Sequence, residues 1–317
     1  MKLNNMSNCL FCYKDSGDKE YHIKCAKRFF GTETMPELNL DKQLLKDLAE
    51  KTISRHIALT GVQPKLSVTL ERNKNNGRLT IVGLWGEYIL KPQHEKLKAM
   101  PETEDLTMHL AEVFGILICK HTLLRATDGN LVYIARRFDR VMGKKIHVED
   151  FCQLSGFLTE NKYKGSYEKA GKLILQYCTN SGLDVLKYFE LLLFCYLTGN
   201  NDMHLKNFSI LHLENSIALS PAYDLLNVNL VFPKDQEEMA LLLNGKKKHI
   251  KLRDFEALGT VLNIPEKVRH NTYRKFKSLS SEVHILINSS FLSSEKKENY
   301  WEIWNKKQRI FEEDFQL

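Results

Sequence analysis

The stretch from Leu183 to Leu197 constrains the fold of this chain more than any other part of the sequence. It is apolar on most faces of a helix, although Lys187 and Glu190 lie within it. A helix without a polar face has to be covered by neighbouring elements, so we expect a buried helix in the core of a helical unit. Helical periodicity extends from about residue 166 to 198, and Gly199-Asn200-Asn201 predicts its end.

The first part of the chain has the character of a sheet. Short alternating stretches predict strands at 66–70, 79–83, 88–92 and 131–135, with a turn at Asn75-Asn76-Gly77. We expect the first three strands to form an antiparallel meander. Helices are predicted at 39–53, where Asp41 is an N-cap candidate, and from Pro101 to Phe114. A β-rich part followed by a helical part indicates an α+β, two-lobed fold.

Composition limits the class of protein. The chain has 317 residues, 43% hydrophobic and 27% charged, which excludes a disordered chain and a small disulfide scaffold. The net charge of +7 suits an anionic ligand or an acidic protein surface, and no direct nucleic-acid binding is expected from it. The longest apolar run, Leu191–Leu197, falls short of the roughly 20 residues of a membrane span. Because the N-terminus has no apolar signal region, we expect a cytoplasmic chain. The seven cysteines are odd in number, which favours reduced thiols over a full set of disulfides.

The segment after the buried helix carries the chemistry. Asp202 and Asn207 lie five residues apart with Lys206 between them, and a short hairpin predicted over 208–219 would return Asp224 to Asn207. Phosphoryl transfer needs a carboxylate for the attacking hydroxyl, and an amide oxygen and a second carboxylate for magnesium. We therefore interpret Asp202 as the base and Asn207 and Asp224 as Mg²⁺ ligands, with Lys206 neutralising charge on the transferred group.

Two upstream features complete this interpretation. Lys91 closes the predicted strand at 88–92, where it could meet nucleotide phosphates and pair with Glu104 in the next helix. The turn formed by Thr60, Gly61, Val62, Gln63, Pro64 and Lys65 could cover the phosphates with backbone amides. With one glycine, this turn is weak evidence by itself.

Together these strings resemble the HipA-type serine/threonine kinase toxins, whose fold is a divergent protein kinase. The matching strings are Gly61–Lys65, Tyr88–Pro92, Glu104 with Leu110-Ala111, Arg137–Arg140, Glu149–Gln153, Asp202–Asn207 and Tyr223-Asp224. They occur in the family's order over roughly residues 55–260.

The resemblance implies roles for these positions. Asp202 would be catalytic, and Asn207 and Asp224 would bind Mg²⁺. Lys91 and the loop Thr60–Lys65 would contact the phosphates of ATP. The remaining nucleotide contacts would be the hinge residues Glu149, Asp150 and Phe151, His204 in the catalytic loop, and Tyr223 beside Asp224.

The chain is also similar in length to the short HipT-like toxins of tripartite systems. That similarity implies a HipB-like DNA-binding antitoxin and a small HipS-like protein as partners. It implies an aminoacyl-tRNA synthetase as substrate, tryptophanyl for the short form and glutamyl for the long form, and hence translation inhibition and growth arrest. The family autophosphorylates a loop serine, where this chain has Ala58; the nearby hydroxyls are Ser54 and Thr60.

Other interpretations stay open at this point. The chain could phosphorylate a small molecule, or be an inactive kinase-like binding module. Asp202 and Asn207 are also ordinary helix-stop and turn residues, and Glu104 could serve the helix dipole. His204 could be a packed polar residue, and Ser54 and Thr60 plain loop hydroxyls.

The first 35 residues form a separate Cys/His head, followed by a predicted N-lobe at 36–155 and a C-lobe at 156–317. Cys9 and Cys12, then His22 and Cys25, have the spacing of a zinc knuckle with two ligands from each of two tight turns. The alternative is a short strap of ordinary thiols packed on the kinase without metal.

Overall fold

The computed structural model describes residues 8–38, 65–72, 77–82, 85–141 and 143–312. The chain forms two compact units. Unit 1 comprises Met1–Leu106, Cys119–Arg137 and Ser289–Leu292, and unit 2 comprises Thr107–Ile118, Phe138–Asn288 and Ser293–Leu317. Among the described residues, no helix is both long and apolar enough to cross a membrane.

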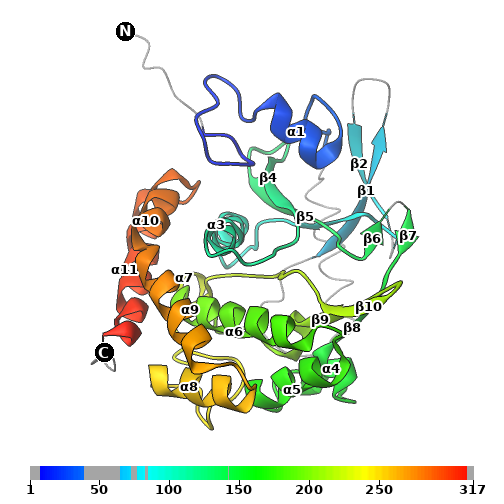
Figure 1. The fold of residues 1–317 in the computed structure, drawn as a ribbon. Helices are drawn as coiled ribbons and strands as arrows, with labels where there is room; N and C mark the ends of the chain where they lie inside the picture. The colour runs from blue at the N-terminus through cyan, green and yellow to red at the C-terminus, as the bar shows by residue number, and fades with distance from the viewer. Residues whose placement is uncertain (1–7, 39–64, 73–76, 83–84, 142, 313–317) are drawn as a thin grey trace. The chain divides into compact units, whose positions relative to one another are not determined.

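Unit 1 contains a five-stranded antiparallel sheet (Figure 1). Its strands are β1 (Leu66–Arg72), β2 (Gly77–Ile81), β3 (Tyr88–Lys91), β4 (His121–Arg125) and β5 (Leu131–Arg136). All four predicted strands are confirmed, and β4 is an additional strand that alternation did not indicate. Lys91 closes β3, as expected.

The order of the sheet, β2-β1-β3-β5-β4, corrects the predicted meander, since β1 lies between β2 and β3. The connection after β2 has to return past β1, and Gly86 makes that passage possible. Its amide hydrogen bonds to Ser67 Oγ at 3.1 Å, and a Cβ at Gly86 would lie 2.6 Å from the Val68 carbonyl oxygen. Such a close backbone approach excludes any larger residue.

The head packs on this sheet through aromatic side chains. Its helix α1 (Ile23–Phe30) ends at Gly31 in the left-handed conformation, φ 75°. The rings of Phe29 and Phe30 each lie 5.8 Å from the ring of Tyr88 on β3. The head is therefore part of the core of unit 1. The alternative interpretation, a short strap of thiols without metal, also predicts this packing.

Unit 2 is mainly helical, so the α+β organisation is confirmed. Helix α3 (Met100–Val113) begins one residue before the predicted Pro101 and contributes to both units. The other helices are α4 (Phe151–Leu154), α5 (Tyr167–Tyr177), α6 (Ser181–Leu197), α7 (Val228–Val231), α8 (Leu252–Val261), α9 (Glu266–Ser278), α10 (Ser280–Ser289) and α11 (Ser294–Gln308). Two short strands, β6 (Arg140–Val141) and β7 (Lys144–Lys145), pair with each other.

The predicted core helix is α6. Phe189, Leu192, Leu193, Phe194 and Leu197 are all fully buried. Within unit 2, Figure 1 shows α5, α8 and α9 around α6. Three strands complete the unit: β8 (His147–Asp150), β9 (Ser209–Leu213) and β10 (Ser216–Leu219), in the order β10-β9-β8.

Candidate active site

The loop after α6 is held by hydrogen bonds to the backbone carbonyl of Asp202. The helix stops at Thr198 and Gly199, whose φ of 68° turns the chain away from the helix axis. The Asp202 carbonyl then accepts hydrogen bonds from the His204 amide at 2.8 Å and from Asn207 Nδ2 at 3.0 Å. Because Nδ2 is used inside the loop, the side-chain oxygen of Asn207 is the atom that could bind a cation.

The predicted hairpin is confirmed. Strands β9 and β10 pair antiparallel with Leu219 opposite Ile210, and the chain then returns to the loop. The Tyr223 hydroxyl donates to the Lys206 carbonyl at 2.9 Å and lies 2.6 Å from Ser209 Oγ. Tyr223 thus ties the segment that carries Asp224 to the loop that carries Asp202.

Asp224 has an unusual backbone. Its φ of 61° is in the left-handed region, which few residues other than glycine adopt. Strained residues of this kind persist where the surroundings hold them, and they cluster at functional sites. Here the preceding residue, Tyr223, is held by its hydrogen bond to the Lys206 carbonyl.

Tyr163 is a site residue that the sequence did not indicate. Its hydroxyl donates to Asp202 Oδ1 at 2.6 Å, and its ring lies edge-on to the His204 ring, 5.0 Å away. Burial and the nearby Asp202 charge raise the pKa of Tyr163 above its usual value of 10.0, so the phenol is a proton donor at neutral pH. Tyr163 is 39 residues from Asp202 in the chain, so no local sequence pattern predicts their contact.

The predicted hinge lies beside the end of the loop that carries Asp202, because β8 pairs with β9. Asp150 stands opposite Ser209, and Glu149 opposite Ile210. The ring of Phe151, which is buried, stacks on Phe208 at 5.5 Å.

Two hinge side chains have protein partners. Asp150 caps α4 and accepts from Lys206 Nζ at 2.7 Å, while Glu149 accepts from His212 Nε2 at 2.8 Å. Lys206 is thus held at the hinge by Asp150, and its expected contact with a transferred phosphoryl group stays a prediction.

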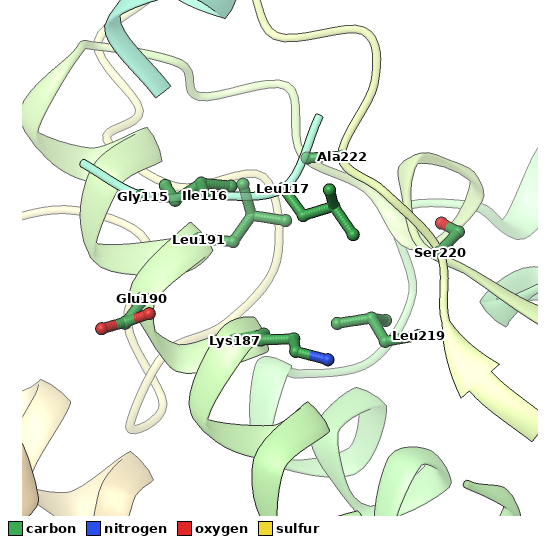
Figure 2. A pocket seen from close by; sticks show the side chains of 9 residues that line it. All are labelled: Gly115, Ile116, Leu117, Lys187, Glu190, Leu191, Leu219, Ser220 and Ala222. Atoms are coloured by element: carbon green, nitrogen blue, oxygen red, sulfur yellow. The ribbon is translucent and has the colours of Figure 1, made fainter. Parts of the chain in front are cut away.

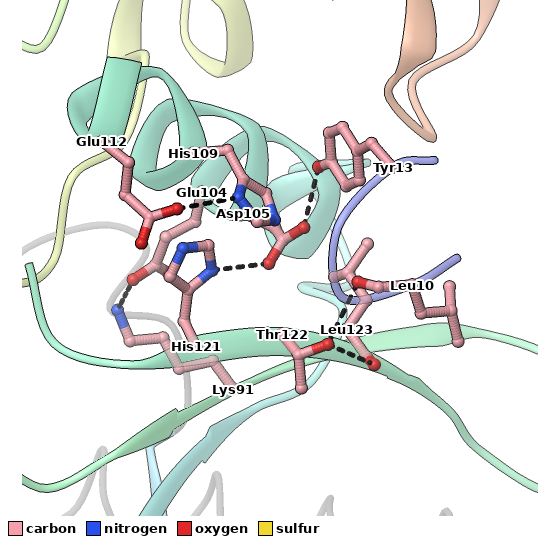
Figure 3. A network of polar contacts seen from close by, with 10 residues as sticks. All are labelled: Leu10, Tyr13, Lys91, Glu104, Asp105, His109, Glu112, His121, Thr122 and Leu123. Atoms are coloured by element: carbon pink, nitrogen blue, oxygen red, sulfur yellow. Dashed lines mark hydrogen bonds and ion pairs between the residues drawn. The ribbon is translucent and has the colours of Figure 1, made fainter. Parts of the chain in front are cut away.

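The ion pair between Lys91 and Glu104 is confirmed within unit 1 (Figure 3). Both side chains are almost completely buried, with residue exposures of 4% and 1%. Lys91 Nζ also lies 5.4 Å from the centre of the Tyr133 ring. A buried ammonium whose partner is a buried carboxylate is held in one place.

Several predictions fall outside the described residues: the helix at 39–53, Ser54, Ala58, and Thr60 to Pro64 of the phosphate loop. Lys65, the last residue of that loop, is described and exposed just before β1.

Within single units of the described chain, two groups of side chains could hold a metal ion by their clustering alone. The first is the predicted set in the head, Cys9, Cys12, His22 and Cys25, which the fold brings together. The second, His147, Glu149 and His212, lies on β8 and β9 and is partly exposed. Only the strand register, which places His147 opposite His212, makes the second group visible.

A cavity of about 80 Å³ lies in unit 2 between α6 and the end of the hairpin (Figure 2). Its wall includes Leu117, Leu191, Leu219 and Ala222, with Lys187 and Glu190 at one side. Ligand pockets for drug-sized molecules are several times larger, so this cavity does not serve for a nucleotide.

Comparison with known proteins places these features in context. A family model described as the HipA-like C-terminal domain matches residues 57–283. A Sinorhizobium fredii protein named as a kinase, Y4dM, is 32% identical over 235 residues, which cover 69% of this chain and 56% of Y4dM. The serine/threonine-protein kinase toxin HipA of Shewanella oneidensis is 25% identical over 210 residues, covering 60% of this chain and 47% of the toxin. The chain therefore spans about half the length of these curated relatives.

Solved structures agree on the fold. A chain in the complex of Shewanella oneidensis HipA, HipB and operator DNA matches with a TM-score of 0.66 and 21% identity, over 83% of this chain and 70% of that one. The Helicobacter pylori proinflammatory kinase CtkA matches with a TM-score of 0.51 and 14% identity, over 78% of this chain and 97% of CtkA. At these identities the likeness concerns the fold alone.

Proposed function

This chain belongs to the HipA-like kinase family, and from that premise we propose that it is a Mg-ATP-dependent serine/threonine protein kinase. The observation that carries the proposal is the joining of three segments within unit 2. Tyr223 binds the Lys206 carbonyl, Asn207 binds the Asp202 carbonyl, and Lys206 binds Asp150. Hydrogen bonds thereby join the loop of Asp202 and Asn207 to the candidate hinge and to Tyr223, the residue before Asp224.

Asp202 is the general base of this proposal. Its carboxylate takes the proton of a serine or threonine hydroxyl as that oxygen attacks the γ-phosphorus of ATP, and ADP leaves. Tyr163 donates to Oδ1 at 2.6 Å, which orients the carboxylate.

The residues also fit a magnesium ion. Asn207 and Asp224 offer amide and carboxylate oxygens, which hard divalent cations prefer. The hydrogen bond from Tyr223 to the Lys206 carbonyl supports a ligand role for Asp224, because it fixes the preceding residue to the loop that carries Asn207. When bound, Mg²⁺ would neutralise charge on the phosphates of ATP.

The remaining nucleotide contacts follow the same proposal. Glu149, Asp150 and His204 would meet adenine and ribose, and the loop from Thr60 to Lys65 would cover the phosphates. Phe151, expected as a contact, is buried against Phe208 and would support the hinge instead. Lys91, oriented by Glu104, would contact the phosphates directly.

We further propose that the kinase is a toxin that phosphorylates an aminoacyl-tRNA synthetase and is restrained by a HipB-like antitoxin. Support comes from the Shewanella HipA relative, which is named as a toxin and whose solved complex contains HipB. A HipS-like small protein and autophosphorylation at Ser54 or Thr60 belong to the same proposal.

The test compares wild type with Asp202→Asn in transfer of radiolabelled γ-phosphate to purified tryptophanyl- and glutamyl-tRNA synthetases. Asparagine keeps the backbone carbonyl that accepts from Asn207 and an oxygen for Tyr163, so folding should be intact. Transfer should fall by about 10²–10⁴-fold, the usual share of a general base. Glu295→Gln, an exposed acid in the first turn of α11, is the matched control and should keep full activity.

The outcomes separate the alternatives. Phosphate on small hydroxyl compounds and not on protein would favour a small-molecule kinase. Equal, near-zero turnover of ATP by wild type and Asp202→Asn, with both folded, would leave an inactive binding module.

A further inference from the structure

The head of unit 1 brings three thiols and one imidazole to a single point. The ligand atoms of Cys9, Cys12, His22 and Cys25 all lie within 4.8 Å of one another. A tetrahedral zinc site, with Zn–S near 2.3 Å and Zn–N near 2.0 Å, separates its ligand atoms by about 3.5–3.8 Å. The distances from His22 Nδ1, 3.4 Å to Cys12 Sγ and 3.9 Å to Cys25 Sγ, are close to those values.

His22 is oriented for metal binding. Its Nε2 lies 2.9 Å from the Asp15 carbonyl oxygen, which can only accept a hydrogen bond, so Nε2 carries the proton. In the neutral ring the lone pair is then on Nδ1, the nitrogen that faces the thiols. A carbonyl that orients the distal nitrogen is the usual outer partner of a metal-bound histidine.

The backbone around Cys9 forms the first tight turn. The Cys9 carbonyl accepts from the Cys12 amide at 3.3 Å and the Tyr13 amide at 2.9 Å. The His22 amide donates to Cys9 Sγ at 3.3 Å, which joins the two turns at the sulfur.

The second turn is the start of α1, where the amides of Cys25 and Ala26 bind the His22 carbonyl. None of the seven cysteines is in a disulfide, although the head cysteines are clustered.

We propose that Cys9, Cys12, His22 and Cys25 bind one structural Zn²⁺ ion. Four protein ligands fill a tetrahedral shell, so the site has no open position for a substrate and its role is to hold the head together.

The structure also indicates what the ion holds in place. Tyr13 follows Cys12 directly, with φ 59° and 4% exposure, and its hydroxyl donates to Asp105 Oδ2 at 2.7 Å. Asp105 Oδ1 pairs with His121 Nδ1 at 2.7 Å, so the head, the first turns of α3 and strand β4 meet at one buried carboxylate (Figure 3). The next residue back is Glu104, the partner of Lys91. Zinc would thus stabilise the turn of α3 that carries Glu104.

The experiment uses the full chain and Zn²⁺ itself. Wild type purified without chelator should contain one zinc per chain by elemental analysis and native mass spectrometry. Cys12→Ser and Cys25→Ser should lose most of the metal. Cys178→Ser changes a thiol of unit 2, far from the head in sequence, and should keep the full zinc content.

A second measurement does not depend on the variants folding. Wild type reloaded with Co²⁺ should show the visible bands of a tetrahedral cobalt thiolate. Removing zinc with a chelator should lower the melting temperature by about 5 °C or more and speed amide exchange in the first turns of α3. Readdition of zinc should reverse both changes.

Kinase activity is not used as a readout, so this proposal and the proposed function fail independently. Zinc-free wild type with a disulfide in the head would overturn the zinc site. So would a Co²⁺ spectrum without thiolate ligands, or loss of zinc from Cys178→Ser equal to that from Cys12→Ser.

Discussion

The buried ion pair between Lys91 and Glu104 allows a quantitative test of the core of unit 1. Because both residues are at most 4% exposed, removing one partner leaves a charge that water cannot reach. Breaking buried pairs in this way costs about 3–5 kcal/mol, and we expect that loss for Lys91→Met. Glu104→Gln keeps an oxygen that can accept from the ammonium, so about 1–3 kcal/mol is expected.

The double variant Lys91→Met/Glu104→Gln removes both charges. Replacement of both members of a buried pair is often nearly neutral, so its cost should be smaller than the sum of the single costs by at least about 2 kcal/mol. The assay is urea unfolding followed by circular dichroism, with the free energy taken from midpoint and slope. Lys96→Met is the control, because Lys96 is exposed in the same unit and should change stability by less than about 0.5 kcal/mol.

Additive costs in this cycle would refute the reasoning. So would a loss below about 1 kcal/mol for Lys91→Met, because the Glu104 carboxylate left behind would then be solvated or paired elsewhere.

Two further predictions concern unit 2. Burial alone would raise the pKa of Asp254, but hydrogen bonds from Lys246 and other donors lower it below 3.8. The group therefore stabilises the fold above about pH 4 and loses this effect as pH falls through its lowered folded pKa. Urea midpoints between pH 7 and 3 should fall more for wild type than for Asp254→Asn, and parallel profiles would contradict this. Gly259→Ala would put a Cβ 2.1 Å from Arg269 Cδ, so a loss of about 1–3 kcal/mol is expected in the same unfolding assay. Gly182→Ala meets nothing within 4 Å and should be neutral or stabilising; equal effects of the two changes would contradict the argument.

The sequence correctly predicted those strands and helices whose pattern of apolar residues lies within a single segment. The alternation of Leu66, Val68 and Leu70 is reproduced as the buried face of β1, and the apolar run of α6 as a buried helix. β4 was missed because four of its five residues are buried, which leaves no alternation. α1 was missed because its N-cap, His22, makes no side-chain cap hydrogen bond.

Some features of the candidate site were likewise predictable from the sequence, whereas contacts between distant segments were not. The order of Asp202, Asn207 and Asp224, the hairpin between them, and the pair of Lys91 with Glu104 were predictable from spacing. The contact of Tyr163 with Asp202 and that of Lys206 with Asp150 span 39 and 56 residues and have no sequence signature.

The sequence alone therefore determined which residues can do chemistry and which segments are buried, because side-chain type and periodicity are properties of the chain itself. Tertiary structure decided the central place of β1, the partner of each site side chain and the orientation of His22 toward three thiols. Those features depend on strand register and on hydrogen bonds between distant segments, which form only when the chain closes around a common core.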